Sequence, residues 1–383
     1  MTGGNTIFLS DPDMSQAEID AVSAVIASPH LSGGRIVESF EQAFAAYVGR
    51  AHAVALASGT IGMLLCLKAY GIGPGDEVIA SSYSWHQIAH AIALAGAKPV
   101  FSEIDYWTGS LAAEKAVEKI TPRTRAILAA NTNGHPAQWE PLRAIAERRG
   151  VLLIEDSTEA IGSAYQGIMV GGFGDCAIFD FSQPAPLVCG EGAMIVTDDG
   201  KLASRLRQLR ARRADDGLAI TGSQPPMQAG ISNLAAALGL TQLQRIESIL
   251  ARRKQVEEWY GLAMQSFEGI KPPYLAPEVT AHHWFLYVVH LGTRFSRSSR
   301  DAIIEDMRTE QVQAAPFCEP LHTQSFYAGE GYRRGAFFVT EKVADRAIAL
   351  PFHGHLSPEQ IGFIVKSAKD ASINVGAGSA IYL

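Results

Sequence analysis

Short apolar strands alternate with helix-like segments along the first half of the chain, and this alternation restricts the fold more than any other feature. The strands are expected at 53–57, 77–81, 99–103, 126–130 and 151–155, and the helices at 61–70, 88–94, 112–119 and 141–149. Strands that are apolar throughout, rather than at every second residue, are typical of a sheet that helices cover on both faces. The sequence therefore predicts an α/β domain with a mostly parallel sheet.

The remaining residues indicate a second, smaller domain. A chain of 383 residues exceeds the usual size of a single hydrophobic core. Helical spacing runs from about residue 233 to residue 260, and a strand at 283–291 and a helix at 300–310 follow it. We therefore expect a large domain over 1–245, which includes an N-terminal arm, and a smaller α/β domain over 246–383 that begins within the long connecting helix.

Composition argues against several classes of function. The net charge is -7 and there is no run of basic residues, which argues against binding nucleic acid. No apolar stretch approaches the length of a membrane span, and the N-terminus lacks a secretory signal. The four cysteines are widely spaced without a C-x-x-C pair, which fits a reduced compartment. We expect a cytoplasmic protein that binds neither nucleic acid nor membrane.

The segment 174–192 has a distinctive order of features. It begins with a strand, expected at 176–181, that is apolar and bulky apart from Asp180. A loop with two prolines follows, then a Gly-Glu-Gly turn and a return strand at 193–197. Polar groups at the end of a buried strand are well placed to meet a ligand in an open α/β sheet.

Together with other motifs, this segment resembles the sugar aminotransferases of the aspartate aminotransferase fold, often called the DegT or DegT/StrS family. The resemblance covers nearly the whole chain. Its landmarks are Ser58-Gly59-Thr60, Gly73 to Val78, Tyr83-Ser84-Trp85, Gly96 to Phe101, Asn133 to Pro136, Glu155 to Gly162, Ala236 to Leu240, Gln242-Leu243, Glu319 to His322 and Leu350-Pro351. Their order implies the type I fold of pyridoxal phosphate (PLP) transferases, with a seven-stranded sheet between helices, and a homodimer with shared active sites.

At two positions the chain departs from the family. The family has a Ser that binds the cofactor phosphate and, five residues later, the Lys of the Schiff base. Counting without gaps from either end of the segment puts Asp180 at the Ser position and Ala185 at the Lys position. Without an amine at residue 185, neither the internal aldimine nor the proton shuttle that follows it can form. Asp180 would also repel the phosphate, and an engineered Lys→Ala change would explain residue 185 alone.

The resemblance implies a partly retained cofactor site. Ser58-Gly59-Thr60 precedes a helix, and its N–H groups would bind the cofactor phosphate; the alternative is an N-cap turn. Trp85 matches the aromatic residue that stacks on the pyridine ring, and Asp156 matches the Asp that pairs with the ring nitrogen. For these two residues the alternatives are a core tryptophan and a helix cap.

Further contacts are expected around this core of the site. Gln228 takes the place of an Asn that reaches the phosphate of the partner subunit, and Ser182 is expected to contact the cofactor. Substrate contacts are expected from His86, Glu191 and His322, the last from the C-terminal region that helps line the family's cleft. A second His four residues after His86 resembles half of a metal site, but no third ligand is visible, so no metal is expected.

Four residues are candidates for acid–base catalysis: Asp156, Glu159, His135 and Asp180. Asp156 ends a strand, and Glu159 would be a second acid or base close to it; the alternative for Glu159 is a solvated residue in the first turn of a helix. His135 follows another strand, where a general base would be useful, and its alternative is a structural histidine.

Three functions follow from this pattern. The first is an enzyme that acts on a small polar metabolite by acid–base chemistry without a Schiff base and without a covalent cofactor. The second is an enzyme that holds PLP or pyridoxamine phosphate (PMP) non-covalently. The third is an inactive dimer partner, or a ligand-binding protein without catalysis. We rank them in this order, and cofactor titration separates the first two.

Overall fold

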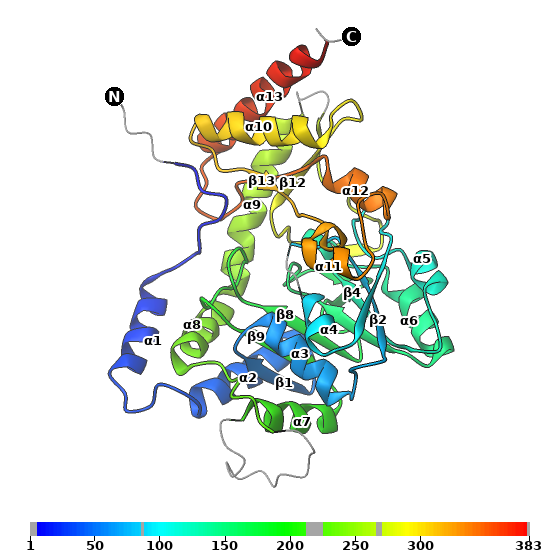
Figure 1. Ribbon diagram of the computed structural model, residues 1–383. Coiled ribbons are helices and arrows are strands. Elements are labelled where there is room, and N and C mark those ends of the chain that lie inside the picture. The colour runs from blue at the N-terminus through cyan, green and yellow to red at the C-terminus, as the bar shows by residue number, and fades with distance from the viewer. Residues whose placement is uncertain (1–5, 86–87, 212–224, 266–269, 381–383) are drawn as a thin grey trace.

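The computed structural model describes residues 6–85, 88–211, 225–265 and 270–380. The sheet of the large domain lies low in Figure 1, and the helix α9 (Ile246–Met264) rises from it to the small domain above. The N-terminal arm, with α1 (Gln16–Ile26), runs down one side of the molecule. In the described ranges, no helix combines the length and apolarity that crossing a bilayer requires.

The large domain is built on a seven-stranded sheet in the order β1-β9-β8-β5-β4-β2-β3. The strands are β1 (His52–Leu56), β9 (Ala193–Thr197), β8 (Cys176–Asp180), β5 (Leu152–Asp156), β4 (Thr124–Ala130), β2 (Glu77–Ser81) and β3 (Lys98–Ser102). Only β9 runs against its neighbours in this sheet; the other pairings are parallel. The prediction of a mostly parallel α/β sheet is therefore confirmed.

Helices cover both faces of this sheet because its strands are apolar on both sides. Val54 and Leu56 pack on one face, whereas Ala53 and Ala55 pack on the other. The first face is covered by α3 (Gly59–Ala69), α4 (His90–Leu94) and α7 (Gly200–Arg210). The second is covered by α2 (Arg35–Val48), α5 (Ala113–Glu118), α6 (Trp139–Arg149) and α8 (Asn233–Gln244).

The small domain has its own core around a four-stranded antiparallel sheet, β10-β12-β14-β13. Its strands are β10 (Ile270–Lys271), β12 (Tyr287–Leu291), β14 (Ala347–Leu350) and β13 (Ala315–Pro316). Its other helices are α10 (Arg297–Thr309), α11 (Ser325–Gly329), α12 (Phe338–Ala344) and α13 (Pro358–Ala380). A third sheet joins the two parts of the chain: β11 (Val279–Ala281) pairs with β6 (Ala164–Tyr165), which pairs on its other side with β7 (Ile168–Met169).

The expected single helix from 233 to 260 is wrong, because it is divided into α8 and α9. Arg245 leaves helical geometry, with φ -104° and ψ 3°. Its guanidinium instead binds Asp13 Oδ1 at 2.8 Å and the carboxylate of Glu18. These ion pairs attach the N-terminal arm to the junction of the two helices. The domain boundary expected at 245–246 falls at this junction and stays a prediction.

A buried carboxylate, Glu155, fixes the end of β5. It accepts hydrogen bonds from the backbone N–H groups of Gly171 at 2.5 Å, Phe173 at 2.9 Å and Gly174 at 3.1 Å. The side chains of Asn131 and Ser157 donate to it as well. Because the loop and the strand end depend on one carboxylate, the position of the next residue, Asp156, depends on it too.

Replacing Glu155 by Ala should destabilise the protein by at least about 3 kcal/mol, because it leaves several buried N–H donors without an acceptor. The free energy of unfolding in urea would be measured for the variant and the natural protein. Glu114→Ala, at an exposed position of α5, is the matched control and should change it by less than about 0.5 kcal/mol. A loss at Glu155 no larger than at Glu114 would contradict the prediction.

Candidate functional site

The candidate site lies where the carboxyl ends of β5, β8 and β2 meet the beginning of α3. Parallel strands that end at the same edge of a sheet bring their following residues together there. Asp156 ends β5 and Asp180 ends β8, and Trp85 lies four residues after the end of β2. The structure therefore gathers, at one edge, residues that are far apart in the chain.

At the beginning of α3, Asp180 occupies the position expected for an anion. The backbone N–H of Gly59 donates to Asp180 Oδ2 at 2.7 Å. Ser58 is the N-cap of the helix, and its side chain accepts a hydrogen bond from Ile61 N at 3.4 Å. Thr60 lies half-buried in the first turn. The N-cap that was expected as the alternative is therefore present. The first N–H of the helix donates its hydrogen bond to Asp180.

The other oxygen of Asp180 is also engaged. Its Oδ1 accepts hydrogen bonds from the backbone N–H of Ser182 at 2.8 Å and from the Ser182 hydroxyl at 2.6 Å. The backbone N–H of Asp180 donates to the hydroxyl of Thr158 at 3.2 Å. Only 7% of Asp180 is exposed, so the carboxylate is held by protein donors in a largely desolvated place.

Asp156 lies buried nearby, and the pKa of its carboxyl is raised. Its Oδ1 accepts a hydrogen bond from Thr158 N at 3.1 Å. Burial raises the pKa of Asp156 from 3.8 to about 7; hydrogen bonds from Thr158 lower it, and the carboxylates of Glu159 and Asp180 raise it. Around neutral pH this carboxyl therefore exists in both protonation states.

Glu159 is buried rather than solvated, so the alternative of an exposed first-turn residue is wrong. Its Oε1 accepts from Trp85 N at 2.7 Å and from the Ser84 hydroxyl at 3.1 Å, and its Oε2 accepts from Asn133 N at 2.6 Å. These contacts tie the loops after β2 and β4 to the end of β5. Glu159 thus fixes the backbone of Trp85 and lies within the electrostatic reach of Asp156.

The ring of Trp85 is half-buried and packs in an aromatic group at the edge of the small-domain core. Its centroid is 6.0 Å from that of Phe317 and 6.5 Å from that of Phe285. Ala185 is also half-buried and packs against the same hydrophobic cluster.

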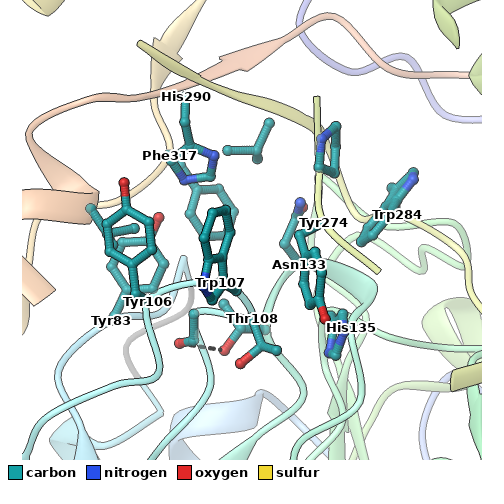
Figure 2. A pocket seen from close by; sticks show the side chains of 15 residues that line it. Tyr83, Tyr106, Trp107, Thr108, Asn133, His135, Tyr274, Trp284, His290 and Phe317 are labelled. Atoms are coloured by element: carbon teal, nitrogen blue, oxygen red, sulfur yellow. Dashed lines mark hydrogen bonds between the residues drawn. The ribbon is translucent and has the colours of Figure 1, made fainter. Parts of the chain in front are cut away.

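His135 belongs to a separate, small aromatic pocket of about 40 Å³. Figure 2 shows it near Tyr274, whose ring lies parallel to it with centroids 6.4 Å apart. Its Nδ1 lies 2.7 Å from Pro136 O, and its Nε2 lies 3.1 Å from Ala276 N. The first contact requires Nδ1–H as donor and the second requires Nε2 as acceptor, which fixes the neutral tautomer. Burial lowers the pKa of His135, and its contacts are those of the structural histidine expected as the alternative.

The chain belongs to the DegT/DnrJ/EryC1/StrS aminotransferase family. The family match spans residues 12–369, so it includes the strand ends, the start of α3 and most of the small domain. The motifs from which the resemblance was inferred lie within this span, and the predicted family is confirmed.

Sugar aminotransferases and related proteins of polysaccharide synthesis are among the chain's relatives in this DegT family. The GDP-perosamine synthase of Caulobacter vibrioides is 34% identical, over 94% of this chain and 96% of that protein. The spore coat polysaccharide biosynthesis protein SpsC of Bacillus subtilis is 32% identical, over 94% and 95%. Both alignments cover nearly the full length of each chain.

Solved structures confirm the type I fold. The S. venezuelae protein DesV, in complex with a ketimine intermediate, has a TM-score of 0.87 and 29% identity, over 96% of this chain and 99% of that one. A sugar aminotransferase of Streptococcus pneumoniae in its PMP form has a TM-score of 0.91 over 98% of this chain and 100% of that one. At 23% identity, the second likeness concerns the fold alone.

Other expected site residues of this DegT family member lie outside the cluster around Asp156. His322 is fully buried, with Nδ1 2.9 Å from Ser82 Oγ and Nε2 3.0 Å from Glu341 Oε1. Gln228 is exposed beside the Gly-rich loop at 33–34, in a hollow of about 330 Å³. Glu191 is exposed in the turn before β9. His86 lies outside the described residues, and the roles of all four stay predictions.

Sequence reasoning missed Thr158 as a member of the site. Its backbone N–H donates to Asp156, and its hydroxyl accepts from the backbone of Asp180. It therefore joins the ends of β5 and β8. The only available signal was its place between Asp156 and Glu159 in the motif, because its contact with residue 180 depends on the pairing of two strands.

The pH dependence of stability should reveal the buried proton of Asp156. Between about pH 4 and pH 7 the folded chain holds a proton that the unfolded chain has released, so this residue's contribution to stability falls as pH rises through that window and levels off above it. Asp156→Asn, which mimics the protonated form, should gain about 2–3 kcal/mol relative to the natural protein between about pH 5 and about pH 8.

Urea unfolding of both proteins at the two pH values measures this difference. Asp370→Asn, at an exposed position of α13, is the control and should show the same difference from the natural protein at both values. An Asp156→Asn variant whose relative stability does not change with pH would show that Asp156 titrates as an ordinary carboxyl.

Proposed function

We propose that this member of the sugar aminotransferase family is an enzyme that acts by acid–base chemistry on a small polar metabolite, without a Schiff base. The observation that carries the proposal is the pair formed by Asp156 and Glu159. The carboxyl of Asp156 has a pKa of about 7, and that of Glu159 accepts hydrogen bonds from Ser84, Trp85 and Asn133. Two neighbouring carboxyls in different environments are suited to different roles in proton transfer.

Membership of the family implies a PLP or PMP cofactor, and the residues at its ring end are suitable. Asp156 ends β5, where it would pair with a ring nitrogen, and the half-buried ring of Trp85 would stack on the cofactor ring. When bound, such a cofactor supplies an electron sink for bonds to an amine-bearing carbon. The ring end alone therefore does not exclude the second function, non-covalent PLP or PMP.

The other end of the site does not fit this cofactor. No lysine occurs between Lys119 and Lys201, so the strand ends and the loop after β8 offer no amine for a Schiff base. The first N–H of α3, which would receive the phosphate, already donates to Asp180. We therefore propose chemistry that depends on Asp156 and not on a covalently bound cofactor.

In this chemistry Asp156 is the group that gives or takes a proton, because both of its forms are populated around pH 7. Glu159 fixes the backbone of Trp85 and, through its charge, helps keep the pKa of Asp156 high. The carboxylate of Asp180 also raises the pKa of Asp156. His135 is the weaker candidate for a base, since both of its ring nitrogens are engaged with the backbone.

We further propose that the chain works as a homodimer. Support comes from apolar side chains on the N-terminal arm: Ile19, Ile26 and Leu31 are 56%, 65% and 52% exposed. Apolar side chains that cluster on one exposed segment are typical of surfaces covered by a partner. An inactive subunit that pairs with a competent relative, the third function, would use the same surface.

Borohydride reduction in the presence of PLP tests the missing Schiff base. The purified protein should yield no stoichiometric pyridoxyl-lysine adduct at any of its lysines and no aldimine absorbance, because the loop after β8 offers no amine. The S. venezuelae protein DesV, whose solved structure contains a ketimine intermediate, would be treated in parallel as a positive control. Rapid amino-group exchange between an amino acid and a keto sugar, on addition of PLP, would contradict the proposed function.

A further inference from the structure

The beginning of α3 is an anion site that already contains an anion. The helix has 11 residues and begins at Gly59, and its first N–H donates to Asp180 Oδ2 at 2.7 Å. Helix N-termini attract phosphate because their N–H groups lack partners and the helix dipole is positive there. Here a side chain of the same chain supplies the negative group.

This carboxylate leaves little room for a second anion. Gly59 is buried, and a Cβ at residue 59 would collide with Asp180 Oδ2 and with Ile88 Cδ1. The carboxylate is anchored on its other side by the N–H and hydroxyl of Ser182. Moving it aside for a phosphate would therefore break three hydrogen bonds of the protein.

The electrostatics of the site also disfavour a second anion. Asp180 and Glu159 both raise the pKa of Asp156, so the surroundings already favour fewer negative charges. Among the described residues, three groups donate hydrogen bonds to the carboxylate of Asp180: the backbone N–H of Gly59, the backbone N–H of Ser182 and the hydroxyl of Ser182. In the described part of the chain no ion pair joins Asp180 to a cation, so its carboxylate would repel a phosphate placed there.

We propose that Asp180 is a built-in replacement for the cofactor phosphate, so that the site selects a flat ligand that carries no phosphate at the α3 end. The ligand class is a neutral or cationic ring, held by the face of Trp85 and by the carboxyl of Asp156. The location of the ligand, between Trp85 and Asp156, is taken from the proposed function. The exclusion of phosphate rests only on Asp180 and its contacts.

The probes are pyridoxamine and pyridoxamine 5′-phosphate, which differ only in the phosphate and form no Schiff base with lysine. Binding would be followed by calorimetry on the full chain. The natural protein should bind pyridoxamine at least as tightly as its phosphate ester. In Asp180→Ser the order should reverse, with a gain of at least about 100-fold in relative affinity for the phosphate ester.

Two further variants keep the result interpretable. Asp180→Asn retains the size of the side chain and removes its charge, so it should show a smaller change in the same direction. Asp370→Ser, on the exposed side of α13, should leave the order unchanged. Circular dichroism and thermal unfolding would establish that each variant is folded.

If neither pyridoxamine nor its phosphate ester binds, inorganic phosphate gives an independent measurement. It should raise the thermal unfolding midpoint of Asp180→Ser and leave that of the natural protein unchanged. A natural protein that prefers the phosphate ester, or an Asp180→Ser variant that gains neither the ester nor inorganic phosphate, would overturn the proposal. The proposed function is tested by different results, namely a pyridoxyl-lysine adduct or rapid amino-group exchange. A failure of one proposal can therefore be distinguished from a failure of the other.

Discussion

The hydrogen bond between Gly59 and Asp180 is the contact on which the site depends. It joins the first turn of α3 to the end of β8, and Thr158 joins the end of β8 to that of β5. These bonds bring three carboxyls into one partly desolvated region. Two of them, Asp180 and Glu159, accept hydrogen bonds from backbone N–H groups and serine hydroxyls. Burial raises the pKa of Asp156, and the neighbouring carboxylates of Glu159 and Asp180 raise it further.

The fold was predictable because burial determines it. Strands β2 and β9 were expected at 77–81 and 193–197 and have these bounds, since apolar runs between turn residues give a strong local signal. The division between α8 and α9 was not predictable, because it depends on ion pairs of Arg245 with residues more than 220 positions earlier. The two-residue strands of the third sheet carry too little pattern to be recognised.

The sequence predicted which residues carry the chemistry of the site, but not which hydrogen-bond partners hold them. Asp156 and Asp180 were expected at strand ends, and the order of the strands then brings them together. Histidines were chosen for their usual pKa, whereas the role of each depends on partners that the sequence does not reveal. His135 is engaged by Ala276 N and His322 by the hydroxyl of Ser82, which are contacts between distant segments. The burial of Glu159 was missed for the same reason, because its donors come from the loops after β2 and β4.

The departures at positions 180 and 185 are physically connected. A chain that forms no Schiff base has lost the covalent hold on a cofactor, so the phosphate subsite would be empty for much of the time. An empty subsite would leave the N–H of the buried Gly59 without an acceptor, at a cost of about 1–3 kcal/mol. A carboxylate at residue 180 satisfies that N–H permanently and complements the positive end of the α3 dipole. Ser at the same position is shorter and uncharged, so it would complement the helix only when a phosphate lies between them. Asp180 thus satisfies the beginning of α3 without a phosphate ligand, which is what the proposed function without a Schiff base requires.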